Sequence, residues 1–122
     1  MKLTCIFCYR DDIVLENELA MAFYDKFPVN EGHMLIVPKR HVEDYFGLNE
    51  AEIQAVNELL FACKKLLDEK YSPDGYNIGA NCGQYAGQTI FHCHVHLIPR
   101  YKGDVENPRG GVRGVIPKKQ SY

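Results

Sequence analysis

The chain has 122 residues, which is enough for one compact domain with a single core and too few for two ordinary domains. Hydrophobic residues make up 46% of the sequence and charged residues 25%, as is typical of globular proteins. The formal net charge of -2 excludes a strong basic excess, so the composition gives no support for bulk nucleic-acid binding.

The lack of a recognisable targeting signal and the cysteine usage both indicate a reducing compartment. No apolar run is long enough to cross a bilayer, and the first five residues lack the apolar stretch of a signal peptide. We therefore expect a cytoplasmic protein without membrane contact. Five cysteines are an odd number, which argues against a complete disulfide framework. The pair Cys5 and Cys8 is better interpreted as a metal-binding or redox pair than as a structural disulfide.

Apolar runs and turn residues predict three strands in the first third of the chain. The first two cover residues 13–17 and 19–25 and are joined by a tight turn. A loop follows, since Pro28 and Gly32 both interrupt regular structure. The third strand covers residues 33–37.

The strongest helix signal begins after Asn49, which has Glu52 three residues on as a capping-box partner. Apolar residues then recur with a helical period of about 3.6 residues up to Pro73. This stripe comprises Ile53, Val56, Leu60, Cys63, Leu67 and Tyr71. We interpret it as a face packed on the core rather than as a surface for a partner.

Two further strands are predicted over residues 76–81 and 90–100. The expected fold class is therefore α+β, a mostly antiparallel sheet of about five strands with one main helix and a short second helix. Beyond residue 103 the chain is rich in glycine, proline and charge and has no hydrophobic period. We expect one main domain over residues 1–103 and a basic arm rich in glycine and proline over residues 104–122.

Three histidines at alternate positions, His92, His94 and His96, carry the most chemical information. In an extended strand their imidazoles would project from one side and line about 13 Å of it. The apolar residues that suit a buried opposite face are Cys93, Val95, Leu97 and Ile98. Two interpretations remain at this point, a zinc site and a phosphate-handling site in which one histidine is a nucleophile.

The segment before the histidines favours the phosphate-handling site. Its glycines let backbone N–H groups approach an anion, and Gln88 and Thr89 can add side-chain donors. A catalytic zinc site would usually have an acidic residue nearby, and residues 79–103 contain none.

These residues carry a family resemblance. The run Gly87-Gln88-Thr89 followed by His92-Cys93-His94-Val95-His96 resembles the signature of the histidine triad family of nucleotide hydrolases and transferases. The likeness extends upstream to residues 23–41 and covers nearly the whole chain from Cys5 to Arg100. A histidine triad fold is what this resemblance implies.

The resemblance also implies a mechanism. His94 would attack the α-phosphorus of a purine nucleotide and form a nucleotidyl-histidine, which water would hydrolyse. His96 would contact the phosphate, His33 would border the triad, and Gln88 and Thr89 would stabilise oxygens. The substrate contacts implied are Asp25 at the ribose, Asn81 beside the sugar or phosphate, and Gly87, Gln88, Thr89, Ile90 and His96. The protein would supply no catalytic metal, and Mg²⁺ would arrive only with the substrate.

A structural zinc ion is implied by the same resemblance. In a zinc-bearing branch of the family, two cysteines join a histidine after the Pro-Lys-Arg run and the first histidine of the triad. The corresponding ligands here are Cys5, Cys8, His41 and His92. Two thiolates and two imidazoles make a closed tetrahedral site, which suits structural Zn²⁺. The alternative is that Cys5 and Cys8 are free thiols on an N-terminal strap.

The leading functional hypothesis is hydrolysis of dinucleoside polyphosphates such as diadenosine tetraphosphate. A nucleoside phosphoramidase is the alternative. Thr89, where that branch commonly has serine, and the lack of tryptophan weaken it. A nucleotide-binding regulatory module ranks third, because the nucleophile is intact. A small sheet with an exposed edge strand favours a homodimer. Arg109 and Arg113 are candidates for contacts with distal phosphates or with a second subunit.

Overall fold

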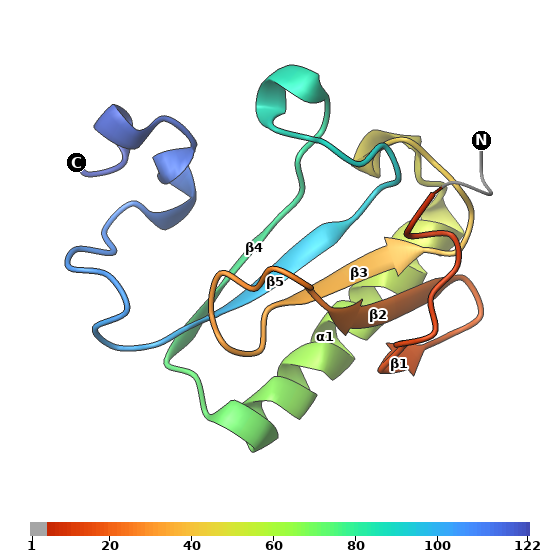
Figure 1. Cartoon of the computed structure of the whole chain (residues 1–122), viewed down its shortest axis with the longest axis horizontal. Helices are drawn as coiled ribbons and strands as arrows, with labels where there is room; N and C mark the ends of the chain where they lie inside the picture. Colours follow the sequence, from red (N-terminus) through yellow and green to blue (C-terminus); the bar gives the residue numbers. More distant parts are fainter. Residues whose placement is uncertain (1–4) are drawn as a thin grey trace.

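The computed structural model describes residues 5–122 and contains one antiparallel sheet with a long helix, α1 (Glu50–Tyr71), against one face (Figure 1). The strands follow the order β1-β2-β3-β5-β4 across the sheet. Their bounds are β1 Leu15–Glu16, β2 Ala20–Tyr24, β3 Met34–Pro38, β4 Gly75–Gly79 and β5 Val95–Arg100. The predicted α+β fold, with a five-stranded antiparallel sheet and one main helix, is confirmed.

The prediction of a short second helix was only approximate. Within residues 5–122 the other helical segments are short 3₁₀ turns. They are η2 Tyr45–Gly47, η3 Gln84–Ala86, η4 Gly111–Val115 and η5 Pro117–Lys119. The part of the chain that the structure describes contains no helix long and apolar enough to cross a membrane.

The last strand is shorter than the sequence suggested. β5 begins at Val95, paired with Ile36 of β3, so the predicted start at residue 90 was wrong. Before that point the Cys93 N–H donates to the Val42 carbonyl at 2.7 Å instead of to a neighbouring strand. The chain leaves the sheet there, and this departure separates His92 from the two later histidines.

The helix begins as its sequence predicts. The Asn49 side chain accepts from the Glu52 N–H at 2.9 Å, and the Glu52 carboxylate accepts from the Asn49 N–H at 3.0 Å. Glu52 is buried, and Arg40 donates to both of its oxygens at 2.8 and 2.9 Å. This pairing keeps the pKa of the Glu52 carboxyl below its usual value.

The two faces of the sheet carry different sets of side chains. On the helix side, α1 packs its buried residues over β2, β3 and β5; these are Ala55, Val56, Leu59, Cys63 and Leu67. Ile53 was predicted to belong to this face but is exposed on the flank of the helix. On the other side a smaller cluster forms from Phe7, Met21, Phe23, Leu35 and Val37.

Alternation along β5 places its histidine on the face opposite the helix. Val95 and Leu97 enter the helix-side core, so His96 and Ile98 point the other way. Ile98 was expected in the buried face, and the period of two instead puts it on the same face as His96.

Residues 104–122, the predicted arm, fold back on themselves near β4 (Figure 1). Arg113 donates to the Gln120 and Lys119 carbonyls, and Gly110 (φ +92°) lies where any Cβ would collide with the Gln120 carbonyl. The guanidinium groups of Arg109 and Arg113 lie over the Tyr122 ring at 4.7 and 4.8 Å. Both arginines, proposed above for substrate or subunit contacts, therefore contact the arm itself.

Candidate active site and metal centre

The triad histidines separate into two environments. His92 is completely buried and turns toward Cys5, Cys8 and His41. His94 and His96 stay together, with ring centroids 5.2 Å apart and planes inclined at 68°. The structure therefore separates His92, which we group with Cys5, Cys8 and His41 as the metal cluster, from the two histidines that lie side by side.

The tautomer of His94 follows from its backbone partner. Its Nδ1 lies 2.8 Å from the His92 carbonyl oxygen, an acceptor only, so Nδ1 carries the proton and donates it. The lone pair is then on Nε2. The edge of Phe7 packs against the same ring, with centroids 5.0 Å apart. His94 is thus held with an unprotonated nitrogen available for attack.

A chain of three hydrogen-bonding groups sets the tautomer of His96. The Val29 N–H donates to His33 Nδ1 at 3.0 Å, so the proton of neutral His33 is on Nε2. His33 Nε2 donates to His96 Nδ1 at 2.9 Å, which leaves the His96 proton on Nε2. Asp25 Oδ2 lies 3.4 Å from the same His33 nitrogen. We call Asp25, His33 and His96 the histidine relay.

Burial keeps the two histidines of the relay neutral. Desolvation lowers the pKa of His33, although the nearby Asp25 carboxylate opposes the shift. Desolvation, with smaller contributions from His94 and His33, lowers the pKa of His96 to about 4. Near pH 7 both rings are therefore uncharged, and His96 offers an N–H donor beside the His94 lone pair.

The loop before the triad is organised by Gln88. Its side-chain amide donates to the Glu43 and Ile90 carbonyls at 2.6 and 3.1 Å and accepts from the Gly83 N–H at 2.8 Å. Both amide hydrogens are thus already used within the protein. Gln88, expected to donate to a phosphate, instead positions the loop.

The other loop residues differ in their exposure to solvent. Gly87 has a φ of +98°, which favours glycine, and Asn81 lies beside it. Thr89 is exposed, and Ile90 packs against the Phe7 cluster. The predicted substrate residues thus form two groups, the Gly87 loop and the residues around Asp25.

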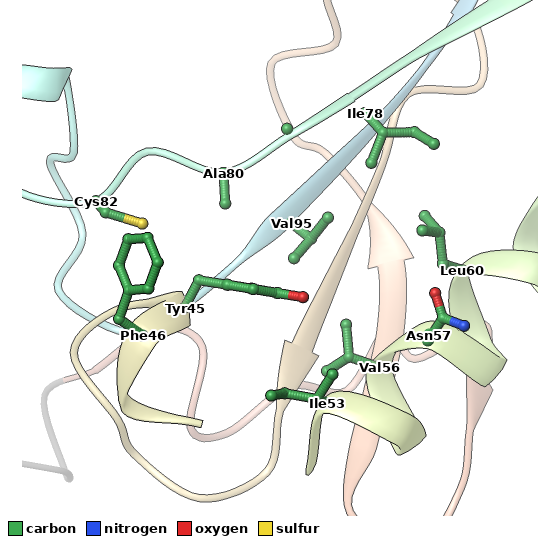
Figure 2. Close-up of a pocket in the computed structure, with 11 residues that line it drawn as sticks. Tyr45, Phe46, Ile53, Val56, Asn57, Leu60, Ile78, Ala80, Cys82 and Val95 are labelled. Carbon is green, nitrogen blue, oxygen red and sulfur yellow. The ribbon is translucent and has the colours of Figure 1, made fainter. Parts of the chain in front are cut away.

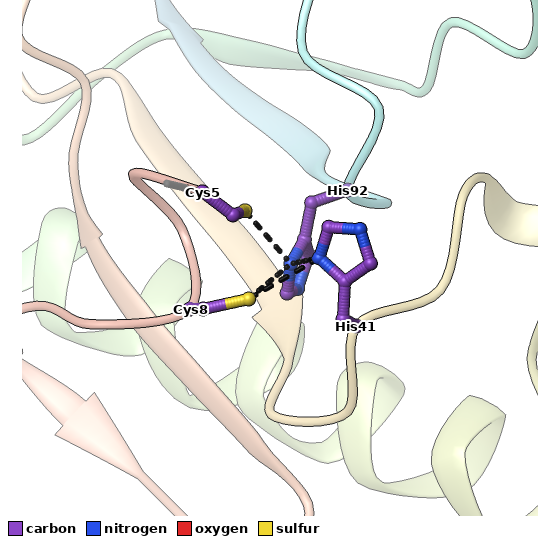
Figure 3. A group of neighbouring side chains, drawn as sticks. All are labelled: Cys5, Cys8, His41 and His92. Carbon is purple, nitrogen blue, oxygen red and sulfur yellow. Dashed lines mark hydrogen bonds between the residues drawn. The ribbon is translucent and has the colours of Figure 1, made fainter. Parts of the chain in front are cut away.

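The four predicted metal ligands converge at one point (Figure 3). Their ligand atoms all lie within 4.8 Å of one another. The Sγ-to-Nδ1 distances are 3.4 Å for Cys5–His92, 3.2 Å for Cys8–His41 and 3.5 Å for Cys8–His92, and the two Nδ1 atoms are 3.2 Å apart. Tetrahedral zinc would separate S from N by about 3.5 Å and N from N by about 3.3 Å. The cluster could hold a metal ion.

The hydrogen bond on the far side of His92 supports the same conclusion. Its Nε2 donates to the Pro38 carbonyl at 2.8 Å, which leaves the Nδ1 lone pair directed at the thiols. The histidine relay also brings together side chains that can bind a metal. There, however, the Val29 N–H donates a hydrogen bond to the lone pair of His33 Nδ1. His33 Nε2 then carries a proton and is not available to a metal.

Sequence reasoning missed three groups that hold these imidazoles in place. The Val29 N–H and the Pro38 carbonyl set tautomers, and the Phe7 ring packs against His94. Two of the three are backbone groups, and no residue type signals their direction. Phe7 could have been suspected, since it lies between the two cysteines.

A separate apolar cavity of about 300 Å³ lies between α1, η2 and β4, on the helix side of the sheet (Figure 2). Its lining includes Tyr45, Phe46, Ile53, Ile78 and Val95. None of the triad histidines lines it.

Comparison with known proteins places the chain in a family. A family model described as the HIT domain matches residues 9–103. The chain belongs to the HIT, or histidine triad, family. Cys5 and Cys8 precede the matched residues.

Three relatives of this HIT protein are informative. An uncharacterized HIT-like protein of Mycoplasma genitalium is 41% identical over 108 residues, which cover 81% of this chain and 74% of that protein. A zinc-bound histidine triad family protein from Mycobacterium smegmatis superposes with a TM-score of 0.78 at 28% identity, covering 88% of this chain and 82% of that one. A protein of Mycobacterium tuberculosis named AP-4-A phosphorylase is 34% identical over 96 residues, 75% of this chain but only 48% of its own length.

Proposed function

We propose that this HIT protein hydrolyses dinucleoside polyphosphates at an α-phosphate through a nucleotidyl group on His94. The observation that carries the proposal is the pair of fixed tautomers. His94 offers a lone pair at Nε2, and His96 beside it offers an Nε2–H donor. One nitrogen is a nucleophile and the other can stabilise an oxygen of the phosphate under attack.

The reaction would take place in two steps. His94 Nε2 forms a bond to the α-phosphorus while the bond from phosphorus to the bridging oxygen breaks, and the remaining nucleoside polyphosphate leaves. Water then attacks phosphorus, the N–P bond breaks, and a nucleoside monophosphate and free His94 result. The His94 Nδ1–H donated to the His92 carbonyl steadies the positive charge that the ring gains in the intermediate.

The neighbouring residues would bind the rest of the nucleotide. Asp25 is suited to accept hydrogen bonds from ribose hydroxyls, since its Oδ1 already accepts the Phe27 N–H and its position is thereby fixed. Thr89, Asn81 and the backbone at Gly87 would contact phosphate oxygens. Gln88 would keep the loop in place through its three hydrogen bonds.

We propose that the metal is Zn²⁺ and that it is structural. Cys5, Cys8, His41 and His92 would hold it, and four protein ligands would leave no position for substrate. Bound zinc would join the N-terminal segment to the chain around β3 and to the residues before β5. No other protein-bound metal is proposed. A cytoplasmic location is part of this proposal, because the thiol ligands stay reduced there.

The name of the tuberculosis relative, AP-4-A phosphorylase, supports the choice of dinucleoside polyphosphates. The chain spans about half the length of that protein. For this chain, dinucleoside polyphosphates are therefore a proposed substrate class. The acceptor for the nucleotidyl group is water in the hydrolase and inorganic phosphate in a phosphorylase. A phosphoramidase would use the same histidines on a P–N bond.

One experiment separates these activities. The zinc-loaded protein is mixed with diadenosine tetraphosphate, with and without inorganic phosphate, and in parallel with an adenosine phosphoramidate. We expect AMP and ATP from the first substrate, a higher kcat/KM than for the phosphoramidate, and an acid-quenched adduct on His94 by mass spectrometry. AMP binding without turnover of either substrate would instead indicate a binding module.

We further propose that the protein is a homodimer formed through β4 and the cavity beside it. β4 is an edge strand of the sheet, and Phe46 and Ile78 there expose 83% and 50% of their surface. A second copy that pairs its own β4 would satisfy the open edge and cover these side chains. Sedimentation should show dimers for the natural protein and for Val105→Glu in the arm, and monomers for Ile78→Glu. Dimers of Ile78→Glu would contradict the proposal.

A further inference from the structure

The two cysteines of the metal cluster enclose a side chain that contacts the nucleophile. Residues 5–8 form a tight turn in which the Cys8 N–H donates to the Cys5 carbonyl at 3.2 Å. We call this segment the knuckle. Its two middle residues differ sharply, since Phe7 is 4% exposed and Ile6 is 55% exposed. One therefore points into the protein and the other into solvent.

Phe7 lies against both His92 and His94. Its ring meets His94 edge-on with centroids 5.0 Å apart and an interplanar angle of 69°, and it lies 6.2 Å from His92. On its other side it contacts Phe23 of β2 at 5.6 Å. The ring is thus wedged between the sheet and the proposed nucleophile, at a place set by Cys5 and Cys8.

The backbone gives a second connection between the cluster and His94. His92 supplies a candidate ligand through its side chain and accepts the His94 Nδ1–H through its carbonyl. Between them, the Cys93 N–H donates to the Val42 carbonyl, next in sequence to the ligand His41. Both ligand-bearing segments therefore support the peptide groups around the nucleophile.

We propose that the metal-bound knuckle is a positioning element for catalysis, with Phe7 as the positioning residue that holds the His94 ring in its hydrogen bond to the His92 carbonyl. This inference rests on the proposed function of His94 and on metal binding at the cluster. It adds a specific task to a site that would otherwise only stabilise the fold. Phe7 has no polar atom and acts only through His94, by restricting the rotation of the ring.

The test compares Phe7→Ala with Ile6→Ala, two truncations one residue apart in the same knuckle. A third variant, Phe7→Leu, keeps apolar bulk in case Phe7→Ala folds poorly. Each zinc-loaded protein is labelled with ¹⁵N-histidine, and the His94 Nδ1–H signal is assigned by its loss in His94→Asn. Zinc content, the rate of adduct formation in a single turnover, and KM are measured on the same samples.

We expect all three knuckle variants to keep one zinc per chain. Phe7→Ala should lose or broaden the His94 Nδ1–H signal and slow adduct formation about 10- to 100-fold with little change in KM, since a misplaced reacting group costs up to about 100-fold. Phe7→Leu should be intermediate and Ile6→Ala unchanged. Chelation of zinc from the natural protein should broaden the same signal.

The proposal is overturned if the signal in Phe7→Ala is as sharp as in Ile6→Ala, or if chelation leaves it intact. The signal reports on ring position without any substrate. Failure of the proposed function, which would be the absence of an adduct in the natural protein, is therefore distinguishable from failure of this inference.

Discussion

The metal cluster and the histidine relay are built from similar side chains and do different chemistry. One contains two cysteines and two histidines, the other an aspartate and two histidines, and each brings its ligating atoms within 4.8 Å. The difference lies in a backbone partner. The Pro38 carbonyl accepts a hydrogen bond from His92 Nε2–H, whereas the Val29 N–H donates to His33 Nδ1. A carbonyl partner leaves the other ring nitrogen, His92 Nδ1, unprotonated and able to bind a metal. An N–H partner leaves the other ring nitrogen, His33 Nε2, protonated, so it acts as a hydrogen-bond donor.

The largest effect that separates the two clusters is expected from His94→Ala. Loss of the nucleophile should abolish the adduct and lower kcat/KM at least about 1,000-fold, because the bond to phosphorus is proposed to form at His94 Nε2. The zinc content should stay at one per chain, as measured by atomic emission. Substantial turnover by His94→Ala would contradict the assignment of the nucleophile, and loss of zinc would show that the clusters are not separate.

Removal of a metal ligand should act on stability. Cys8→Ser is expected to lose the zinc and, where free zinc exceeds its Kd about 1,000-fold, to lower the free energy of unfolding by about 4 kcal/mol. Denaturant melts with and without chelator would measure this difference.

Cys63→Ser is not a suitable control, since that thiol is buried in the core. Ser72→Ala, at an exposed hydroxyl beyond α1, is suitable and should keep the metal. An unchanged chelator effect in Cys8→Ser would contradict the ligand assignment.

The number of zinc ions bound per chain tests whether the metal cluster binds metal and the histidine relay does not. Titration into the metal-free protein should saturate at one equivalent, because the Val29 N–H keeps a proton on His33 Nε2 and so denies the relay to a metal. His33→Ala should leave the stoichiometry unchanged. A second tight equivalent that disappears in His33→Ala would show that the relay binds metal.

The same His33→Ala variant should impair catalysis moderately. Without His33 the tautomer of His96 is no longer set, so kcat should fall about 100-fold, the lower end of the range for a proton-donating group, with KM nearly unchanged. Asp25→Asn should mainly raise KM, since Asp25 is proposed to bind ribose. A change in KM with no change in kcat for His33→Ala would contradict the proposal that His33 sets the tautomer of His96.

A pH dependence of stability is also expected. Because burial lowers the pKa of His96 to about 4, the unfolded chain binds this proton more readily than the folded protein between about pH 4 and the ordinary histidine value. The stability contribution is therefore complete above about pH 6.5 and is lost as the pH falls toward 4. The measurement is denaturant unfolding at several pH values. His96→Asn, which does not titrate, should flatten this slope, and an identical slope would contradict the neutral buried state.

Much of the fold was readable from local patterns. The capping box at Asn49 and Glu52 marked the start of α1 correctly, because both hydrogen bonds are made within one turn of helix. The apolar run of β3 and the period of two around His96 gave the faces of the sheet. Ile53 and the start of β5 were assigned wrongly, because both depend on what packs nearby and not on the period alone.

For the site, too, some features could be predicted from the sequence and others depend on the tertiary structure. The alternate spacing identified the histidine motif, and the resemblance to the histidine triad family indicated all four members of the metal cluster, whose ligand atoms the structure brings together. Which nitrogen of each histidine carries a proton was decided by the tertiary structure. The Pro38 carbonyl, the His92 carbonyl and the Val29 N–H settle that question. Every residue has such backbone groups, and only the folded chain determines which imidazole they face.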